Sequence, residues 1–326
     1  MKRTVLVRSL LVPVIIFGLV GFSQAQEVND AIEAYNNAWK LSSSDPTTAI
    51  VSAKECLDFC SQLGAEGTDV KIKAENLLPG LYFNVGNLLI KGKKFDQAIP
   101  AFQEALKVAE KYKNEEYVVK SKSMLPKLYN SIGGTYYKEE QFDKAVEALN
   151  QAIVYDPDYA KAYYTMGLVY KKLDDQEKFE STMDKGLIAA DNSKDSKTKD
   201  QIKKAANTFF LASGTKSLAD GKAAEAAPLL NKALKYDPAG IDTYFYLARS
   251  YNELKQYDAA IEAANKALEI EEPSDDKRAK HFYNLGLAYK GKGDKEAACE
   301  AFNKALFGQF KENAQYEIEY GVKCNE

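Results

Sequence analysis

One spacing of small and aromatic residues recurs along this chain and limits its fold more than any other feature. In one copy, Tyr129, Gly133 and Tyr136 are followed by Ala145 and Leu149. These positions form two apolar stripes with helical spacing, separated by a short turn. A pair of short amphipathic helices buries its apolar face only when neighbouring pairs stack on it. The spacing therefore predicts a stack of helix pairs rather than one compact core.

The small residue of the first helix marks the register of the copies. It stands at intervals of 47, 34, 47, 34 and 38 residues, at Gly86, Gly133, Gly167, Gly214, Ala248 and Gly286. The two longer intervals place extra residues within 108–123 and 190–206. These segments are rich in Lys, Glu, Asp and Ser. We expect them to form lengthened helix ends and exposed connections.

The large side chains of the copies are expected to fill the space between helices. An aromatic residue precedes the small residue by four positions in every copy, and we predict that it lies in the core: Tyr82, Tyr129, Tyr163, Phe210, Tyr244 and Phe282. The copy over 160–193 is unequal to the others. It has Phe179, Met183 and Gly186 where alanine, phenylalanine and alanine are expected, which predicts looser packing there.

The full pattern resembles the signature of the tetratricopeptide repeat (TPR) family over about 30–310. One copy of that signature is met by Phe282, Leu285, Gly286, Tyr289, Ala298, Phe302 and Ala305. The resemblance implies an all-α fold, a right-handed superhelical TPR solenoid of about seven helix–turn–helix repeats with a C-terminal capping helix. We expect a signal peptide over 1–25, a degenerate N-terminal helix pair over 26–64, the TPR array over 79–310 and the capping helix over 311–326.

The N-terminus has the order of a secretory signal peptide. Lys2, Arg3 and Arg8 precede an apolar stretch over 9–22, and small residues lead to Ala25. This order predicts cleavage after Ala25. The alternative is an uncleaved anchor, although the apolar stretch is shorter than the ~20 residues of a membrane span. We expect an exported protein of the periplasm or cell envelope of a Gram-negative bacterium.

Charge and hydropathy restrict the partners. Without Lys2, Arg3 and Arg8 the chain keeps 41 basic against 47 acidic side chains, a net charge of −6. Nucleic-acid binding normally requires a basic face, so we expect no nucleic-acid partner. No second apolar run approaches membrane-spanning length. We expect no transmembrane span in the mature chain, and association with a membrane only through a complex.

Four cysteines lie outside the central repeats: Cys56, Cys60, Cys299 and Cys324. In an oxidising compartment they can pair. Cys56 and Cys60 are one helical turn apart, where side-chain directions usually strain a disulfide. We favour a disulfide between Cys299 and Cys324, because it would fasten the last helix onto the final repeat.

The sequence contains no recognisable catalytic or metal-binding motif. His281 is the single histidine, which removes the usual Ser-His-Asp and Cys-His combinations unless this imidazole serves. We predict a surface or partly packed histidine. Multi-histidine metal sites, calcium loops, P-loops and GxGxxG motifs are absent. We expect a protein that is not an enzyme and needs no cofactor and no metal.

The resemblance implies that the first helix of each repeat lines a concave groove that binds a protein or peptide segment. Carried over position by position, the polar and aromatic members on this face include a set that we call the predicted groove residues: Phe83, Asn87, Lys127, Asn130, Tyr137, Lys138, Lys161, Tyr164, Lys171, Lys172, Phe245, Arg249, Asn252, Lys280, Tyr283 and Lys290. The acids at these positions are Asp242 and Glu253. The excess of lysine predicts an acidic partner.

Other interpretations of this face remain open. The predicted groove residues can instead be ordinary solvated side chains. Some family members clamp a C-terminal carboxylate, but Phe83 and Thr165 replace two of the basic residues of that clamp. The chain can also be a structural subunit of an envelope assembly or secretion complex, held by its convex face. An accessory array of a hydrolase is a further alternative, but no span of about 100 residues is left for a catalytic domain.

Overall fold

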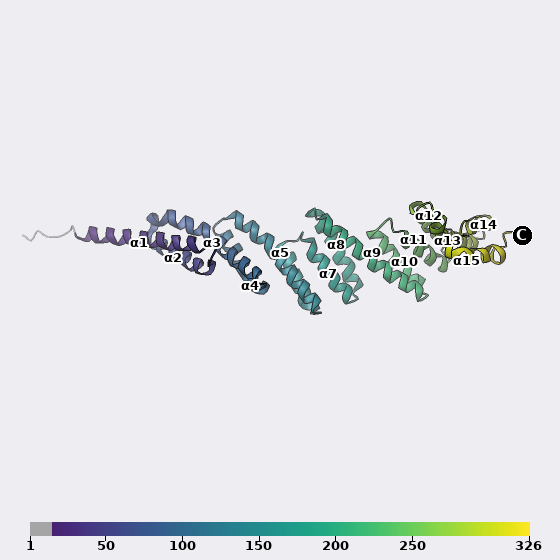
Figure 1. Cartoon of the computed structure of the whole chain (residues 1–326), viewed down its shortest axis with the longest axis horizontal. Coiled ribbons are helices and arrows are strands. Elements are labelled where there is room, and N and C mark those ends of the chain that lie inside the picture. Colours follow the sequence, from purple (N-terminus) through teal and green to yellow (C-terminus); the bar gives the residue numbers. More distant parts are fainter. Residues whose placement is uncertain (1–14) are drawn as a thin grey trace, which may run out of the picture. The chain divides into compact units, whose positions relative to one another are not determined.

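The computed structural model describes residues 15–326, with side chains from Gln26 onward, and it is built from helices without strands in that range. The chain divides into two compact units, which we call unit 1, ending at Thr165, and unit 2, Met166–Glu326. Helices make up the described part of both units (Figure 1). The first 14 residues of the predicted signal peptide lie outside the described residues. No helix in the described part of the chain has the length and apolar character to cross a membrane.

Unit 1 is a series of antiparallel helix pairs. Its elements are α1 (Ile15–Leu41), α2 (Pro46–Leu63), the short 3-10 turn η1 (Gly64–Gly67), α3 (Thr68–Lys91), α4 (Phe95–Lys111), α5 (Glu115–Lys138), α6 (Phe142–Tyr155) and the start of α7 (Ala160–Lys172). The pairs α1/α2, α3/α4 and α5/α6 are packed together, and α2 contacts α3 as α4 contacts α5. We call the odd-numbered members α1 to α13 first helices and the even-numbered members second helices.

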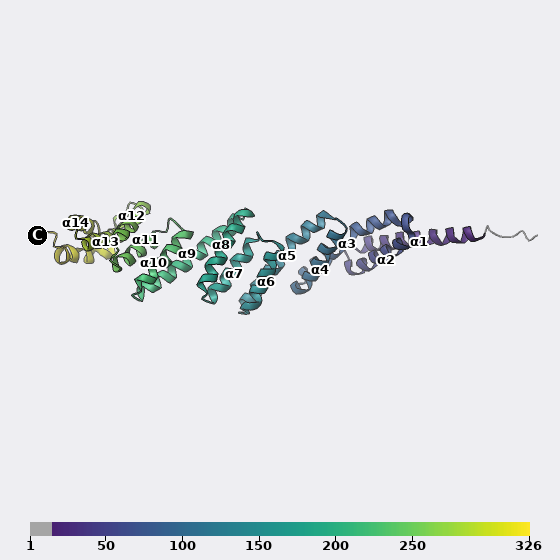
Figure 2. The same ribbon diagram turned by 180° about the vertical axis from the view of Figure 1, so that it is seen from behind.

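Unit 2 repeats the same arrangement (Figure 2). It contains the end of α7, α8 (Gln176–Asn192), α9 (Ser196–Ala219), α10 (Ala223–Tyr236), α11 (Ile241–Glu253), α12 (Tyr257–Ile270), α13 (Asp275–Lys292), α14 (Lys295–Lys304), η2 (Gly308–Phe310), α15 (Lys311–Tyr316) and η3 (Glu317–Gly321). First helices also contact each other, α9 with α11 and α11 with α13. Both units thus have the architecture of an all-α TPR solenoid.

The small residues permit the close approach of paired helices. A Cβ atom added at Gly133 would lie 2.7 Å from Cγ of Leu149, and one added at Gly286 would lie 2.7 Å from Cδ1 of Phe302. Such distances are too short for carbon atoms, because the interior is already close-packed. Ala145 and its equivalents in the other second helices are fully buried. The recurring spacing in the sequence therefore encodes helix contact directly.

The extra residues of the two long intervals enter the first helices. α5 and α9 are 24 residues long, whereas α7 and α11 have 13. Each lengthened helix begins at a polar cap: the Asn114 side chain accepts a hydrogen bond from the backbone N–H of Tyr117, and that of Asp195 accepts one from Thr198. Such caps satisfy one of the unpaired donors of a helix start.

The prediction that the recurring aromatic residues lie in the core is confirmed only in part, since most of them pack against the core without being enclosed by it. Of the six recurring aromatic residues only Phe210 is fully buried, and the other five are half-buried. Tyr82 shows why: its ring forms one wall of a surface cavity of about 450 Å³ between α2, α3 and α4. The position faces the neighbouring repeat, but the second helices do not close over it.

The repeat over 160–193 is not loosely packed. Phe179 and Met183 are fully buried. The Phe179 ring centroid lies 4.3 Å from that of Phe209, and the methyl group of Met183 fills the space above Gly167. Met183 is flexible enough to adapt its shape to the large Phe179 side chain nearby, so both residues are enclosed.

Candidate protein-binding surface

The predicted groove residues of unit 1 lie on one face of each first helix. In α5, Lys127, Asn130 and Lys138 are spaced by 3 and 8 residues, which places them on the same side of the helix. In α7, Lys161 and Tyr164 are likewise 3 apart. The Thr165 hydroxyl group donates a hydrogen bond of 3.0 Å to the Asn130 side-chain oxygen, so these faces of α5 and α7 adjoin.

The lysines of this face carry uncompensated charge. Lys127, Lys138 and Lys161 are exposed. Lys127 contacts only the Ser123 hydroxyl group, at 3.4 Å, and none of the three forms an ion pair within the described residues. Three other lysines in the described part of unit 1 are in ion pairs: Lys107 with Glu104 at 3.3 Å, Lys120 with Glu116 at 2.5 Å and Lys122 with Glu110 at 3.2 Å. We call Lys127, Lys138 and Lys161 the lysine face.

The aromatic and amide residues of unit 1 are less available than the lysines. Phe83 is half-buried, with its ring centroid 5.0 Å from Phe102 and 5.7 Å from Tyr117. It therefore packs against its own repeat and against the first helix of the next one. Asn87, Tyr137 and Tyr164 are half-buried, and the Tyr137 ring lies 6.4 Å from that of Phe142.

In unit 2 the predicted cations are mostly neutralised. Lys171 and Lys172 at the end of α7 are exposed. The remaining three form ion pairs: Arg249 with Glu253 at 3.2 Å, Lys280 with Asp242 at 3.0 Å and Lys290 with Glu317 at 2.6 Å. The two units thus present different chemistry at equivalent positions.

The face of α11 and α13 is aromatic and joined by asparagines. Asn252 donates from its side chain to the backbone oxygen of Asn284 at 2.9 Å, and Asn284 donates to that of Phe245 at 3.3 Å. Phe245 and Tyr283 also contact Phe310, a residue of the segment that follows the last repeat, at centroid distances of 6.2 and 5.5 Å. Asn284 and Phe310 were not predicted. Phe310 lies beyond the repeating pattern, so no spacing identifies it.

His281 is fully buried, and the prediction of a surface or partly packed histidine is wrong. Its Nε2 atom lies 3.4 Å from a carboxylate oxygen of Glu271, which also lies 3.6 Å from the Lys280 ammonium group. Burial, together with the charge of Lys280, lowers the pKa of His281 to about 4, against the opposing effect of Glu271. The imidazole is therefore neutral at physiological pH. His281 lies in α13, and Glu271 lies in the turn between α12 and α13.

This histidine predicts a pH-dependent stability. The unfolded imidazole titrates near 6.5 and the folded one near 4, so the unfolded state binds the extra proton between these values. Stability is complete above about pH 6.5 and falls as the pH drops toward 4. We expect the melting temperature of the wild type to fall more between about pH 7 and about pH 5 than that of His281→Phe. An equal fall in both proteins would contradict the assignment.

The cysteines divide into a disulfide and two thiols. Cys299 and Cys324 form a disulfide that ties α14 to the C-terminal segment. Cys56 and Cys60 are free and buried in α2. Burial raises the pKa of Cys56 to about 12, so it stays a thiol at neutral pH and is not a reactive nucleophile.

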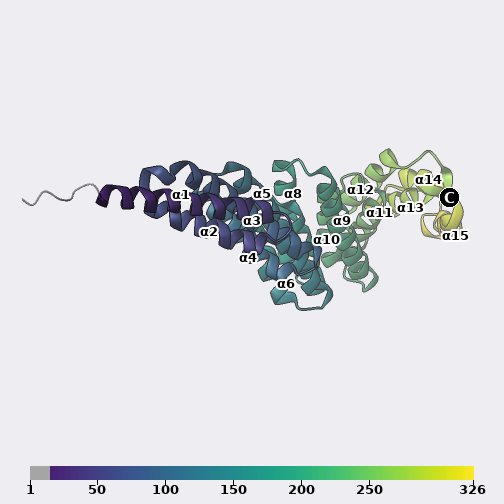
Figure 3. The same cartoon turned by 60° about the vertical axis from the view of Figure 1, so that its left-hand side comes forward.

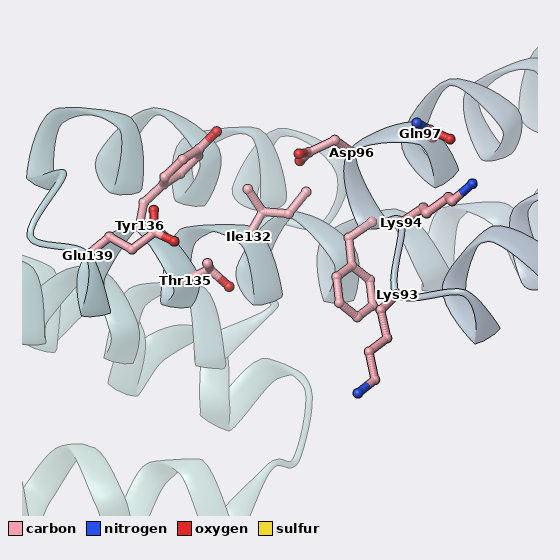
Figure 4. Close-up of a pocket in the computed structure, with 9 residues that line it drawn as sticks. Lys93, Lys94, Asp96, Gln97, Ile132, Thr135, Tyr136 and Glu139 are labelled. Carbon is pink, nitrogen blue, oxygen red and sulfur yellow. The ribbon is translucent and has the colours of Figure 1, made fainter.

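None of the predicted groove residues lines the cavity shown in Figure 4. The cavity in Figure 4 has a volume of about 380 Å³ and lies between α5 and the turn from α3 to α4. Its walls are Ile132, Thr135, Tyr136 and Glu139 on one side and residues 93–97 on the other. Both charges occur in it, and no histidine or cysteine lines it. Across residues 15–326 no three His, Cys, Asp or Glu side chains are grouped so that they could hold a metal ion.

Comparison with known proteins agrees with this architecture. Three repeat models match the chain, one described as a TPR repeat over 133–174 and two as tetratricopeptide repeats over 241–306 and 79–112. The chain therefore contains TPR repeats in these three segments.

Several solved structures are similar to the chain. They include YrrB, described as a TPR protein with an unusual peptide-binding site, at 19% identity over 61% of this chain and 89% of that chain, with a TM-score of 0.32. MamA protein is 21% identical over 61% of this chain and 96% of the MamA chain, with a TM-score of 0.34. MamA from Desulfovibrio magneticus RS-1 has 22% identity over 58% and 96%, with a TM-score of 0.32.

Proposed function

We propose that this protein is an exported, non-enzymatic scaffold that binds an acidic segment of a partner protein on the lysine face of unit 1. TPR repeats form protein-binding scaffolds in general. Binding of an acidic segment on the lysine face is supported by one observation. Three exposed lysines without ion pairs lie on adjoining first helices of an acidic protein.

The chemistry of this face suits an extended or helical segment. Lysines attract an acidic partner, while Asn130 and the half-buried Tyr137 and Tyr164 lie between them on the same helices. Each exposed charge contributes little by itself, up to about 1 kcal/mol. Several in a row provide specificity and a fast association rate.

Export is part of the proposal. It is supported by the order of basic, apolar and small residues before Gln26. The Cys299–Cys324 disulfide is compatible with it, because disulfides persist mainly in oxidising compartments. The periplasm or cell envelope of a Gram-negative bacterium is the compartment we propose.

The test compares two charge-reversed proteins. Lys127→Glu/Lys138→Glu/Lys161→Glu changes the lysine face, and the matched control Lys107→Glu/Lys111→Glu/Lys144→Glu changes three exposed lysines on second helices of the same unit. Charge reversal of the lysine face should lower the affinity for the partner by at least about tenfold, which corresponds to roughly 1.4 kcal/mol of binding free energy. The control should bind like the wild type.

The partner is captured from native envelope with the wild-type protein and its affinity is measured for each variant. Circular dichroism should show equal helicity in all three proteins. If the control variant loses the partner while the lysine-face variant keeps it, the protein is held by its second helices. A stoichiometric complex in that case would indicate the alternative, a structural subunit of an envelope assembly.

A further inference from the structure

The predicted groove residues Phe245 of α11 and Tyr283 of α13 are already in contact with the chain's own C-terminal segment. Phe245 and Tyr283 occupy equivalent positions of consecutive first helices, and the Phe310 ring lies against both. The segment that carries Phe310 leaves α14 and passes Asp276 at the start of α13 before α15 begins. Figure 3 shows this C-terminal end of unit 2, with α13, α14 and α15 labelled. We call residues 306–310 the strap.

The strap is held by two half-buried side chains: Leu306 packs against the core of α14, and Phe310 packs against α11 and α13. Phe307, Gly308 and Gln309 are exposed, and Phe310 itself is only half-buried. The strap has backbone hydrogen bonds only within its own neighbourhood, from Phe307 to Ala305 and from Phe310 to Phe307. Gly308 has a φ of +53°, a conformation that glycine adopts without strain. Few contacts therefore oppose local opening of the strap.

The helix that follows is anchored separately. Ala314 and Ile318 are buried against Ala298 and Phe302 of α14, and the disulfide ties Cys324 to the same helix. Residues 307–310 can consequently lift from α11 and α13 while Leu306 and the rest of the C-terminal segment stay in place.

The residues around the Phe310 ring determine which side chain of a partner could take its place. Lys280 lies 5.8 Å from the Phe245 ring centroid, but Asp242 and Glu271 neutralise its charge. The walls that remain are the two aromatic rings, which favour another aromatic ring in a tilted or edge-on arrangement. The charge of a partner segment therefore has little effect on binding at this site, in contrast to the lysine face of unit 1.

We infer that Phe245 and Tyr283 form a docking site for an aromatic side chain of a partner segment, and that Phe310 occupies this site as a built-in competitor. The inference rests on the proposed function, because it extends the binding of a partner segment to the first helices of unit 2. According to this inference the partner segment carries an aromatic residue, and the Phe310 contact lowers the affinity of the protein for that segment.

The test uses the full-length, disulfide-bonded chain and a labelled peptide with the sequence of residues 306–313. A second peptide carries alanine in place of the residue that corresponds to Phe310. Binding is followed by NMR up to the millimolar concentrations that a tethered segment reaches. Phe310→Ala should bind the first peptide at least about tenfold more tightly than the wild type and should not bind the second. Phe307→Ala, which changes an exposed neighbour, should behave like the wild type.

A further variant distinguishes the site from general loosening of the C-terminus. Phe310→Ala/Phe245→Ala should bind the first peptide no more tightly than the wild type does. The melting temperature of Phe310→Ala should stay close to that of the wild type. Equal peptide binding by the wild type and Phe310→Ala, or equal binding of both peptides, overturns the inference. Neither outcome involves Lys127, Lys138 or Lys161, so the proposed function of the lysine face is tested independently.

Discussion

Replacing Phe302 with alanine is expected to lower the free energy of unfolding of unit 2 by about 3–5 kcal/mol. The ring is fully buried, and it lies against Gly286 and 5.8 Å from the Tyr283 ring. Gly286 has no side chain with which to fill the cavity that the variant leaves. Collapse of the surrounding helices is restricted, because α13 and α14 already touch at this glycine, so the loss should lie at the high end of the range.

Urea denaturation followed by circular dichroism measures this loss. Phe307→Ala is the matched control, since it removes the same side chain from an exposed position of the same unit. The control should change stability by no more than about 0.5 kcal/mol. A loss below about 1 kcal/mol for Phe302→Ala would show that the ring is not the centre of the last helix pair.

Removing the disulfide with Cys299→Ser/Cys324→Ser is expected to cost about 3 kcal/mol. The two cysteines are 25 residues apart in sequence, and a closed loop of that length restricts the unfolded chain by roughly this amount. The loss should be concentrated in α15 and η3. Hydrogen exchange of their backbone amides should accelerate while exchange in α11 and α12 stays slow.

A dithiol reductant provides the control for the disulfide. It should lower the stability of the wild type to that of the serine variant and leave the serine variant unchanged. Thiol labelling of the denatured, unreduced wild type should modify two cysteines, Cys56 and Cys60. Labelling of all four would contradict the bridge.

Much of the fold can be predicted from the spacing of the small and aromatic residues, because these residues lie where paired helices touch. Gly133 and Gly286 identify the points where paired helices touch, and the structure leaves no room there for a side chain. The depth of each aromatic residue does not follow from spacing. Tyr82 and Tyr244 face the neighbouring repeat as expected, but both line cavities between second helices that lie too far apart to cover them.

The candidate surface could be predicted only in part. The exposed lysines of α5 and α7 follow from their positions on a helix face. The neutralisation of Lys280 and Lys290 does not, since Glu271 lies at the end of α12 and Glu317 lies beyond the last repeat. His281 is similar: its burial depends on the fold of the turn that brings Glu271 beside it, and a single histidine forms no pattern.

Site-specific photocrosslinking in the native envelope tests the central claim most directly. A photoreactive residue replaces Lys161 on the lysine face or Lys107 on a second helix of the same unit. We predict that one partner protein is attached from position 161 and that none is attached from position 107. Attachment of the partner from position 107 alone would contradict binding on the first helices.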